Sequence, residues 1–155
     1  MASTPSTTDL RQRIVQTAQS FLSRFEESST KNDASIINLD VTEDCTRYML
    51  PASVNQAFQL PADFFFDNKT YQGAVSNDIK VLKFKNNILS NLVIDTEARL
   101  ATFTSIAKIH PVDGTDFYPA EQAWYLYFNE DGSKVTKVVE FCDKNVLVKM
   151  ASASR

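Results

Sequence analysis

The first hydrophobic pattern along the chain has the period of an α-helix. From Asp9 onward, apolar side chains recur at steps of three and four residues, which places them on one helical face. The members of this stripe are Leu10, Ile14, Ala18, Phe21, Leu22 and Phe25. Thr8 or Asp9 is suited to cap the start, the period fades in the polar residues 28–33, and a further helical turn is expected at 35–39. A second stripe predicts a helix over about residues 68–84; its members are Tyr71, Ala74, Val75, Ile79 and Leu82.

Alternation of apolar and polar residues predicts the strands. A strand is expected over Cys45–Leu50, before Pro51, and longer ones over 88–94, 100–109, 121–128 and 134–142, with a short strand near 146–149. The segment 129–132, Asn-Glu-Asp-Gly, is a strong hairpin signal between the last two long strands. Helices followed by an antiparallel meander predict an α+β fold in which a curved sheet wraps its helices.

The predicted organisation is one domain. It spans residues 9–150, between a disordered tail at 1–8 and a short C-terminal tail at 151–155, and 155 residues suffice for one sizeable core. A net charge of -3 without a Lys/Arg cluster argues against nucleic acid as a partner. No apolar run reaches the length of a membrane span, and the start lacks the pattern of a signal peptide. Two cysteines make no disulfide framework, so a reducing, cytoplasmic setting is the simplest interpretation.

Several kinds of chemistry are excluded by composition. His110 is the sole histidine and no Cys-x-x-Cys pair occurs, which leaves no common metal-binding pattern. Three glycines are too few for a phosphate-binding loop or a dinucleotide fingerprint. We therefore expect neither cofactor nor metal, and any chemistry must come from carboxylates, tyrosines and an arginine.

Glu140 is the strongest candidate for such chemistry. It lies between Val139 and Phe141 in an apolar strand, where a carboxylate is costly to bury unless it is paired or protonated. Such a residue is either a member of a structural ion pair or an acid tuned for proton transfer. In the preceding strand the more apolar face should meet the helices; it comprises Gln122, Trp124, Leu126 and Phe128. Strand parity alone does not decide which way Glu140 points.

Further candidates have equally good structural explanations. Arg47 shares a strand face with Met49 and either reaches outward to water or pairs with a buried carboxylate, for which Glu140 is the natural partner. Tyr118 either supplies a phenol to a pocket rim or packs on a turn beside prolines. Phe65, in the run Phe64–Phe66, belongs either to an apolar loop over a ligand or to the core.

Three segments carry a resemblance to a known family. They are Asp44–Ser53 with its Asp-Cys and Pro-Ala-Ser, Val93–Ala101, and Glu121–Gly132, which runs on to Val138–Asp143 with its Val-Glu-Phe-Cys-Asp. With the order of elements, they resemble the nuclear transport factor 2-like superfold, and within it the small SnoaL-like proteins of fungal secondary metabolism. The likeness covers nearly the whole chain beyond its N-terminal tail and identifies no single reaction.

The resemblance implies a cone whose concave sheet face holds an apolar pocket under the helices. Family members catalyse cofactor-independent isomerisations, cyclisations and rearrangements of meroterpenoids, polyketides and prenylated indole alkaloids. It places Glu140 and Arg47 in the pocket and Tyr118 and Gln122 at its mouth. The expected roles are catalysis for Glu140, Arg47 and Tyr118, and substrate binding for Gln122, Trp124, Met49 and Phe65.

At two positions the chain departs from the family pattern, which limits the residue roles that the resemblance implies for it. Many relatives carry Tyr at the position of Gln122, and an amide cannot donate a proton as a phenol does. Some carry His at the position of Arg47, whose permanent positive charge removes any histidine-based mechanism. A dehydratase or epoxide-opening enzyme of the same fold, and a non-catalytic ligand-binding or partner-binding dimer, remain the alternatives; a homodimer through the outer sheet face is expected.

Overall fold

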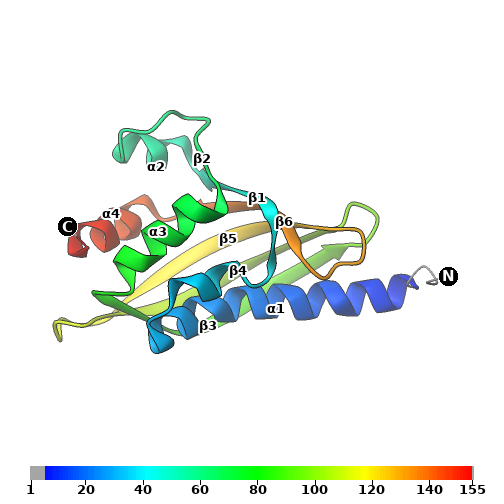
Figure 1. Ribbon diagram of the computed structural model, residues 1–155, viewed down its shortest axis with the longest axis horizontal. Helices are drawn as coiled ribbons and strands as arrows, with labels where there is room; N and C mark the ends of the chain where they lie inside the picture. Colours follow the sequence, from blue (N-terminus) through cyan, green and yellow to red (C-terminus); the bar gives the residue numbers. More distant parts are fainter. Residues whose placement is uncertain (1–5, 155) are drawn as a thin grey trace.

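A computed structural model describes residues 6–154 of the chain. One six-stranded sheet carries the helices of these residues, and Figure 1 shows the long first helix running lengthwise along the strands. The helices are α1 (Thr7–Lys31), the 3₁₀-helix η1 (Ala34–Asn38), α2 (Ala52–Ala57), α3 (Asn68–Asp78) and α4 (Lys144–Ala153). The strands are β1 (Val41–Leu50), β2 (Phe65–Phe66), β3 (Leu82–Asp95), β4 (Leu100–Pro111), β5 (Tyr118–Phe128) and β6 (Val135–Cys142). The fold is α+β in a single domain, as predicted.

The first helix follows the predicted stripe. Its residues Leu10, Ile14, Ala18, Phe21 and Leu22 are buried against the sheet. Ser6 caps the helix, since its hydroxyl oxygen accepts a hydrogen bond of 3.1 Å from the amide of Asp9. The helix thus takes in the last two residues of the tail expected at 1–8, and residues 1–5 of that tail lie outside the described part of the chain.

The strand order corrects the prediction of a purely antiparallel sheet. The order is β2-β1-β6-β5-β4-β3, in which β3 to β6 form the predicted antiparallel meander. β1 pairs with β6 in parallel, with Arg47 beside Val138 and Met49 beside Glu140. Parallel strands require a long connection, and here residues 51–134, about half of the chain, lie between the two partners. Neighbouring patterns along the sequence could not reveal this pairing.

The predicted hairpin between β5 and β6 is confirmed. The amide of Asn129 donates to the carbonyl of Lys134 across the turn, at 2.9 Å. Gly132 has φ 76°, and a Cβ there would approach Ile14 Cγ1 to 3.0 Å. A glycine is therefore required both by the turn and by the close approach of α1.

Two further elements differ from expectation. α3 ends at Asp78, because Leu82 and Phe84 alternate with Lys83 as the buried side chains of β3 rather than continuing the helical stripe. The short strand expected near residues 146–149 is wrong, since Asp143 caps α4 by accepting hydrogen bonds from the amides of Asn145 and Val146.

The core is divided into two clusters along the sheet. α1 packs on one cluster, which contains Trp124, and α3 packs on the other, which contains Tyr71 and Leu82. Phe25, near the end of α1, contacts both. Helices α3 and α4 lie near each other at one end of the sheet (Figure 1), and the second cluster is incompletely filled there.

Candidate active site

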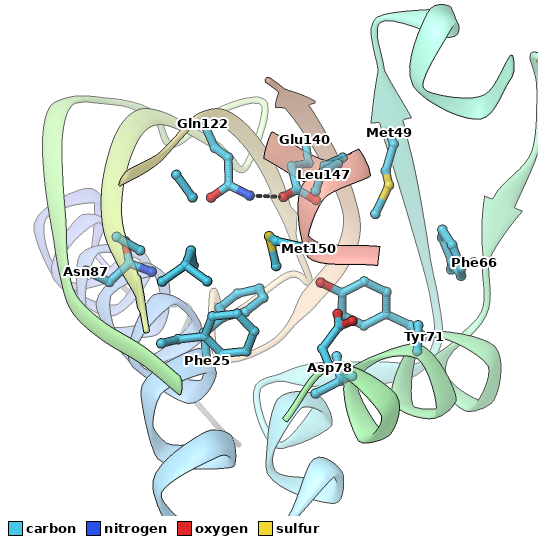
Figure 2. A pocket seen from close by; sticks show the side chains of 16 residues that line it. Phe25, Met49, Phe66, Tyr71, Asp78, Asn87, Gln122, Glu140, Leu147 and Met150 are labelled. Carbon is cyan, nitrogen blue, oxygen red and sulfur yellow. Dashed lines mark hydrogen bonds between the residues drawn. The ribbon is translucent and has the colours of Figure 1, made fainter. Parts of the chain in front are cut away.

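Glu140 points inward from β6, the strand between β1 and β5. Its side chain is 5% exposed. Trp124 is its direct partner on β5, and Gln122, two residues away on the same face, is its diagonal neighbour. The side-chain amide of Gln122 donates a hydrogen bond to Oε1 of Glu140 (Figure 2). The sheet register therefore holds a carboxylate and an amide together on the face that meets the helices.

Glu140 opens onto a cavity of about 100 Å³, here called the inner chamber. Its walls are mostly apolar, and they come from α1, α3, α4 and the inner sheet face: Phe25, Met49, Phe66, Tyr71, Ala74, Val75, Asp78, Phe84, Asn87, Ala107, Ile109, Ala120, Gln122, Glu140, Leu147 and Met150. A second cavity of about 280 Å³, the outer chamber, lies against it toward α2 and the end of α4. The two chambers share Met49, Phe66, Ala74, Asp78, Leu147 and Met150.

Polar groups face Glu140 from the opposite wall. Figure 2 shows the hydroxyl of Tyr71 and the carboxylate of Asp78, both on α3, across the chamber from Glu140 and Gln122. Asn87 reaches the chamber from β3, and its Oδ1 is buried without a hydrogen-bond partner in residues 6–154. The chamber can thus contact several oxygen atoms of a ligand whose remaining surface is apolar.

Sequence reasoning missed Tyr71, Asp78 and Asn87 as site residues. A signal existed for Asp78, which follows Ala74 and Val75 at helical spacing and so interrupts the apolar stripe of α3 with a carboxylate. That is the same kind of signal that singled out Glu140 in its strand.

Arg47 is buried, but it forms no ion pair with Glu140 in the structure. Its Nη2 donates to the carbonyl of Ile37 at 3.2 Å, while Nε and Nη1 are buried without partners among the described residues. Its guanidinium lies 4.0 Å from the ring centroid of Tyr71, a cation–π contact. Tyr71 rather than Arg47 lines the chamber, so the positive charge acts on the site from behind that ring.

Burial dominates the electrostatics of the two carboxylates. It raises the pKa of Glu140 to about 7, against the opposing effects of the Arg47 charge and of hydrogen bonds from Cys142 and Gln122. Burial also raises the pKa of Asp78 to about 7. The pKa of Tyr71 is raised by burial and by the nearby charge of Glu140. Near neutral pH, each carboxyl is therefore able to gain or lose a proton.

Of the residues predicted to bind substrate, Met49 lines the chambers, whereas Trp124 and Phe65 do not. Met49 lines both chambers. Trp124 is in the core behind Phe25, where its indole donates to Ser105 Oγ at 2.8 Å. Phe65 is 45% exposed and packs on Tyr48, whereas its neighbour Phe66 lines the chambers.

Two further aromatic side chains lie outside the chamber walls. Tyr118 is half-buried beneath the ammonium of Lys149, 4.0 Å from the ring centroid, and burial and the charge of Asp78 raise its pKa. His110 stacks on Phe117 at the far end of β4. Neither side chain belongs to the walls of either chamber.

Within residues 6–154, no three His, Cys, Asp or Glu side chains gather in a way that could hold a metal ion. Among the same residues, no helix has the length and hydropathy needed to cross a membrane.

Comparison of the structure with solved structures identifies its fold. It is similar to an NTF2-like protein of unknown function from Burkholderia pseudomallei, with TM-score 0.63, 8% identity, and coverage of 91% of this chain and 98% of that one. The chain has the nuclear transport factor 2-like fold. The expected α+β cone is thereby confirmed.

Within that fold, two proteins from Penicillium are more similar. The BvnE pinacolase of Penicillium brevicompactum matches with TM-score 0.76 and 22% identity over 93% of this chain and 95% of that one. PrhC of Penicillium brasilianum matches with TM-score 0.73 and 17% identity over 93% and 89%. The sequence itself matches no protein-family model and no curated protein.

Proposed function

We propose that this protein is a cofactor-free isomerase or cyclase. Its substrate would be an apolar, oxygenated polycyclic metabolite, such as a meroterpenoid, a polyketide or a prenylated indole alkaloid, which undergoes ring formation or a skeletal rearrangement. The observation that carries the proposal is a buried Glu140, held by Gln122, in a mostly apolar chamber. The similarity in fold to a pinacolase supports the same class of reaction.

The residues divide into a reacting group and the groups that position it. Glu140 transfers the proton, a contribution of about 10²–10⁴ in rate for general acid–base catalysis. Gln122 fixes the orientation of Glu140, and Arg47 favours its ionised form through space. Met49 and Phe66 shape the wall. Tyr118, Trp124 and Phe65 lie outside the chamber walls, so we assign them no contact with substrate.

The proposal has a direct test with α-pinene oxide, a bicyclic apolar epoxide that rearranges to campholenic aldehyde without change of mass. We expect the wild-type protein to accelerate this isomerisation over the reaction in buffer, as measured by gas chromatography and mass spectrometry. Glu140→Gln should lower the rate by about 10² or more. The matched control is Glu97→Gln, an exposed glutamate in the turn between β3 and β4, which should keep the wild-type rate.

The same assay separates the alternatives. An epoxide-opening enzyme would convert α-pinene oxide to sobrerol, which has gained one water. A ligand-binding protein would bind the epoxide without converting it. Equal rates for the wild type and Glu140→Gln would contradict the proposed function.

We also propose that two copies of the chain associate through the outer face of the sheet. This face exposes large apolar side chains, among them Ile106, Tyr125 and Phe141. Glu121 and Lys137 are exposed on the same face, so a second copy would offer each a charge of opposite sign. The buried free thiols Cys45 and Cys142 are in keeping with a reducing, cytoplasmic location.

A further inference from the structure

Asp78 occupies an unusual position for a carboxylate. It is the last residue of α3, where the carbonyl end of the helix dipole disfavours negative charge. It lines both chambers, so a ligand that extends from one to the other passes it. The inner chamber, at about 100 Å³, is smaller than the roughly 300–1,000 Å³ of common ligand pockets. A polycyclic substrate must therefore occupy both chambers.

No structural role within the described residues accounts for Asp78. No ion pair within 4 Å and no side-chain hydrogen bond involves its carboxylate there, and burial is the only cause of its pKa shift. Glu140 differs, because Gln122 donates to it and the charge of Arg47 opposes its protonation. Within the described part of the chain, Asp78 therefore has no group that stabilises its charge, whereas Glu140 has such groups, and this is the asymmetry expected between an acid and a base.

We propose that Asp78 is a second catalytic residue, the general acid that protonates a strained substrate oxygen while Glu140 across the chamber acts as the base. This assignment rests on the proposed function and extends it to a substrate class, epoxides on an apolar polycyclic skeleton. Its geometric basis is the facing of the two carboxyls from α3 and β6 (Figure 2), with Asp78 at the junction of the chambers.

The proposed step balances without any co-reactant. Asp78 gives its proton to the epoxide oxygen as the C–O bond breaks, and a neighbouring C–C bond migrates with its electron pair to the electron-poor carbon. Glu140 then removes the hydroxyl proton as the carbonyl forms. The product keeps every atom of the substrate, while Asp78 is left ionised and Glu140 protonated. Proton exchange with water through the outer chamber restores both groups.

The titration of the two acids gives the proposal a pH signature. Asp78 must be protonated, so activity falls as the pH rises through about 7, and Glu140 must be ionised, so activity falls as the pH drops through about 7. The rate profile is therefore bell-shaped, and its apparent pKa values belong to the pair. The other titratable or charged groups near the pair are Tyr71 on α3, Arg47 on β1, Cys142 on β6, Tyr118 on β5 and Lys149 on α4.

The experiment compares Asp78→Asn with Asp44→Asn, an exposed aspartate on β1, in the rearrangement of α-pinene oxide between pH 5 and 9. We expect Asp78→Asn to lose about 10² in rate and to lose the alkaline limb of the profile, while its acidic limb remains. Asp44→Asn should reproduce the wild-type profile. If Glu140→Gln is inactive but Asp78→Asn keeps the wild-type rate and profile, the acid role is refuted and the proposed function stands. If the wild type is no faster than the Asp78→Asn, Glu140→Gln double variant, both are refuted.

A labelling measurement on the wild type requires no variant to fold. Dicyclohexylcarbodiimide reacts with carboxyls that are protonated in apolar surroundings. At pH 7, mass spectrometry of peptides should find the adduct at Asp78 and not at Asp44. Labelling of both aspartates alike, or of neither, would contradict a protonated Asp78 that is reachable from the outer chamber.

Discussion

The ionised form of Glu140 lowers the free energy of unfolding, because its charge is buried in the folded protein. Its pKa rises from an ordinary value near 4.5 to about 7 on burial, so the folded protein binds a proton that the unfolded chain has already released between those values. Stability from this group is present at low pH and is lost as the pH rises through about 7. A carboxylate retained under such a penalty is characteristic of a functional site.

The Glu140→Gln variant should therefore be more stable than the wild type at pH 8, by on the order of 3 kcal/mol, while the difference disappears toward pH 4.5. The substituted amide still has an oxygen for the hydrogen bond from Gln122. Urea unfolding of both proteins at pH 5 and pH 8 measures the two differences. Glu97→Gln, at an exposed position in the turn between β3 and β4, should show none, and an equal difference at both pH values would argue against a buried titrating carboxylate.

At the scale of single residues, the sequence predicted part of the candidate site. An acid between Val139 and Phe141 marked Glu140, and strand alternation put Gln122 on the face toward the helices. The pairing of Arg47 with Glu140 was a reasonable expectation, but Tyr71 lies against the guanidinium instead. Such contacts depend on how α3 crosses the sheet, which no local pattern encodes.

Among the elements, α3 carries the groups that sequence analysis did not assign to the site. Its stripe was recognised, but its end was not, because Leu82 and Phe84 continue an apolar pattern that fits a helix as well as a strand. The change of element after Asp78 places that carboxylate at a helix terminus. A helix running to residue 84 would have hidden it among interior positions.

Gly73 makes α3 less stable than an alanine at this position would. It is helical, exposed, and a Cβ there would meet nothing within 4 Å. Gly73→Ala should raise the free energy of unfolding by about 1 kcal/mol without altering activity, since alanine loses less conformational freedom in a helix. Thermal and urea denaturation measure the effect. The matched control is Gly114→Ala, at φ 84°, which should instead lower stability; a loss of stability in both would contradict the expectation.

The whole molecule has one sheet face under helices and one face open. Side-chain alternation predicted which face of β5 is internal, since Trp124, Leu126 and Phe128 are all buried. Tyr125 lies between these residues along β5 and points to the outer face, where it is 43% exposed. A standard stable interface takes about 20 to 30 residues from each partner and buries about 800 Å² on each. The outer sheet face is broad enough to supply such an area.

Tyr125→Arg should convert a dimer into a monomer, because two like charges would meet at the centre of the proposed interface. Light scattering after size-exclusion chromatography gives the mass of wild type and variant. Leu39→Arg, at an equally exposed apolar residue beside η1, is the control and should leave the mass unchanged. A wild-type mass equal to that of one chain would rule out the dimer.

The parallel pairing of β1 with β6 bears on how the protein is made. β6 is the last strand among the described residues, yet it lies inside the sheet, between β1 and β5. During synthesis, β1 must wait for almost the entire sequence to leave the ribosome before its inner edge is covered. Contacts between such distant segments close slowly. Glu140 lies on that final strand, so its carboxyl enters the inner chamber in the same event that pairs β6 with β1.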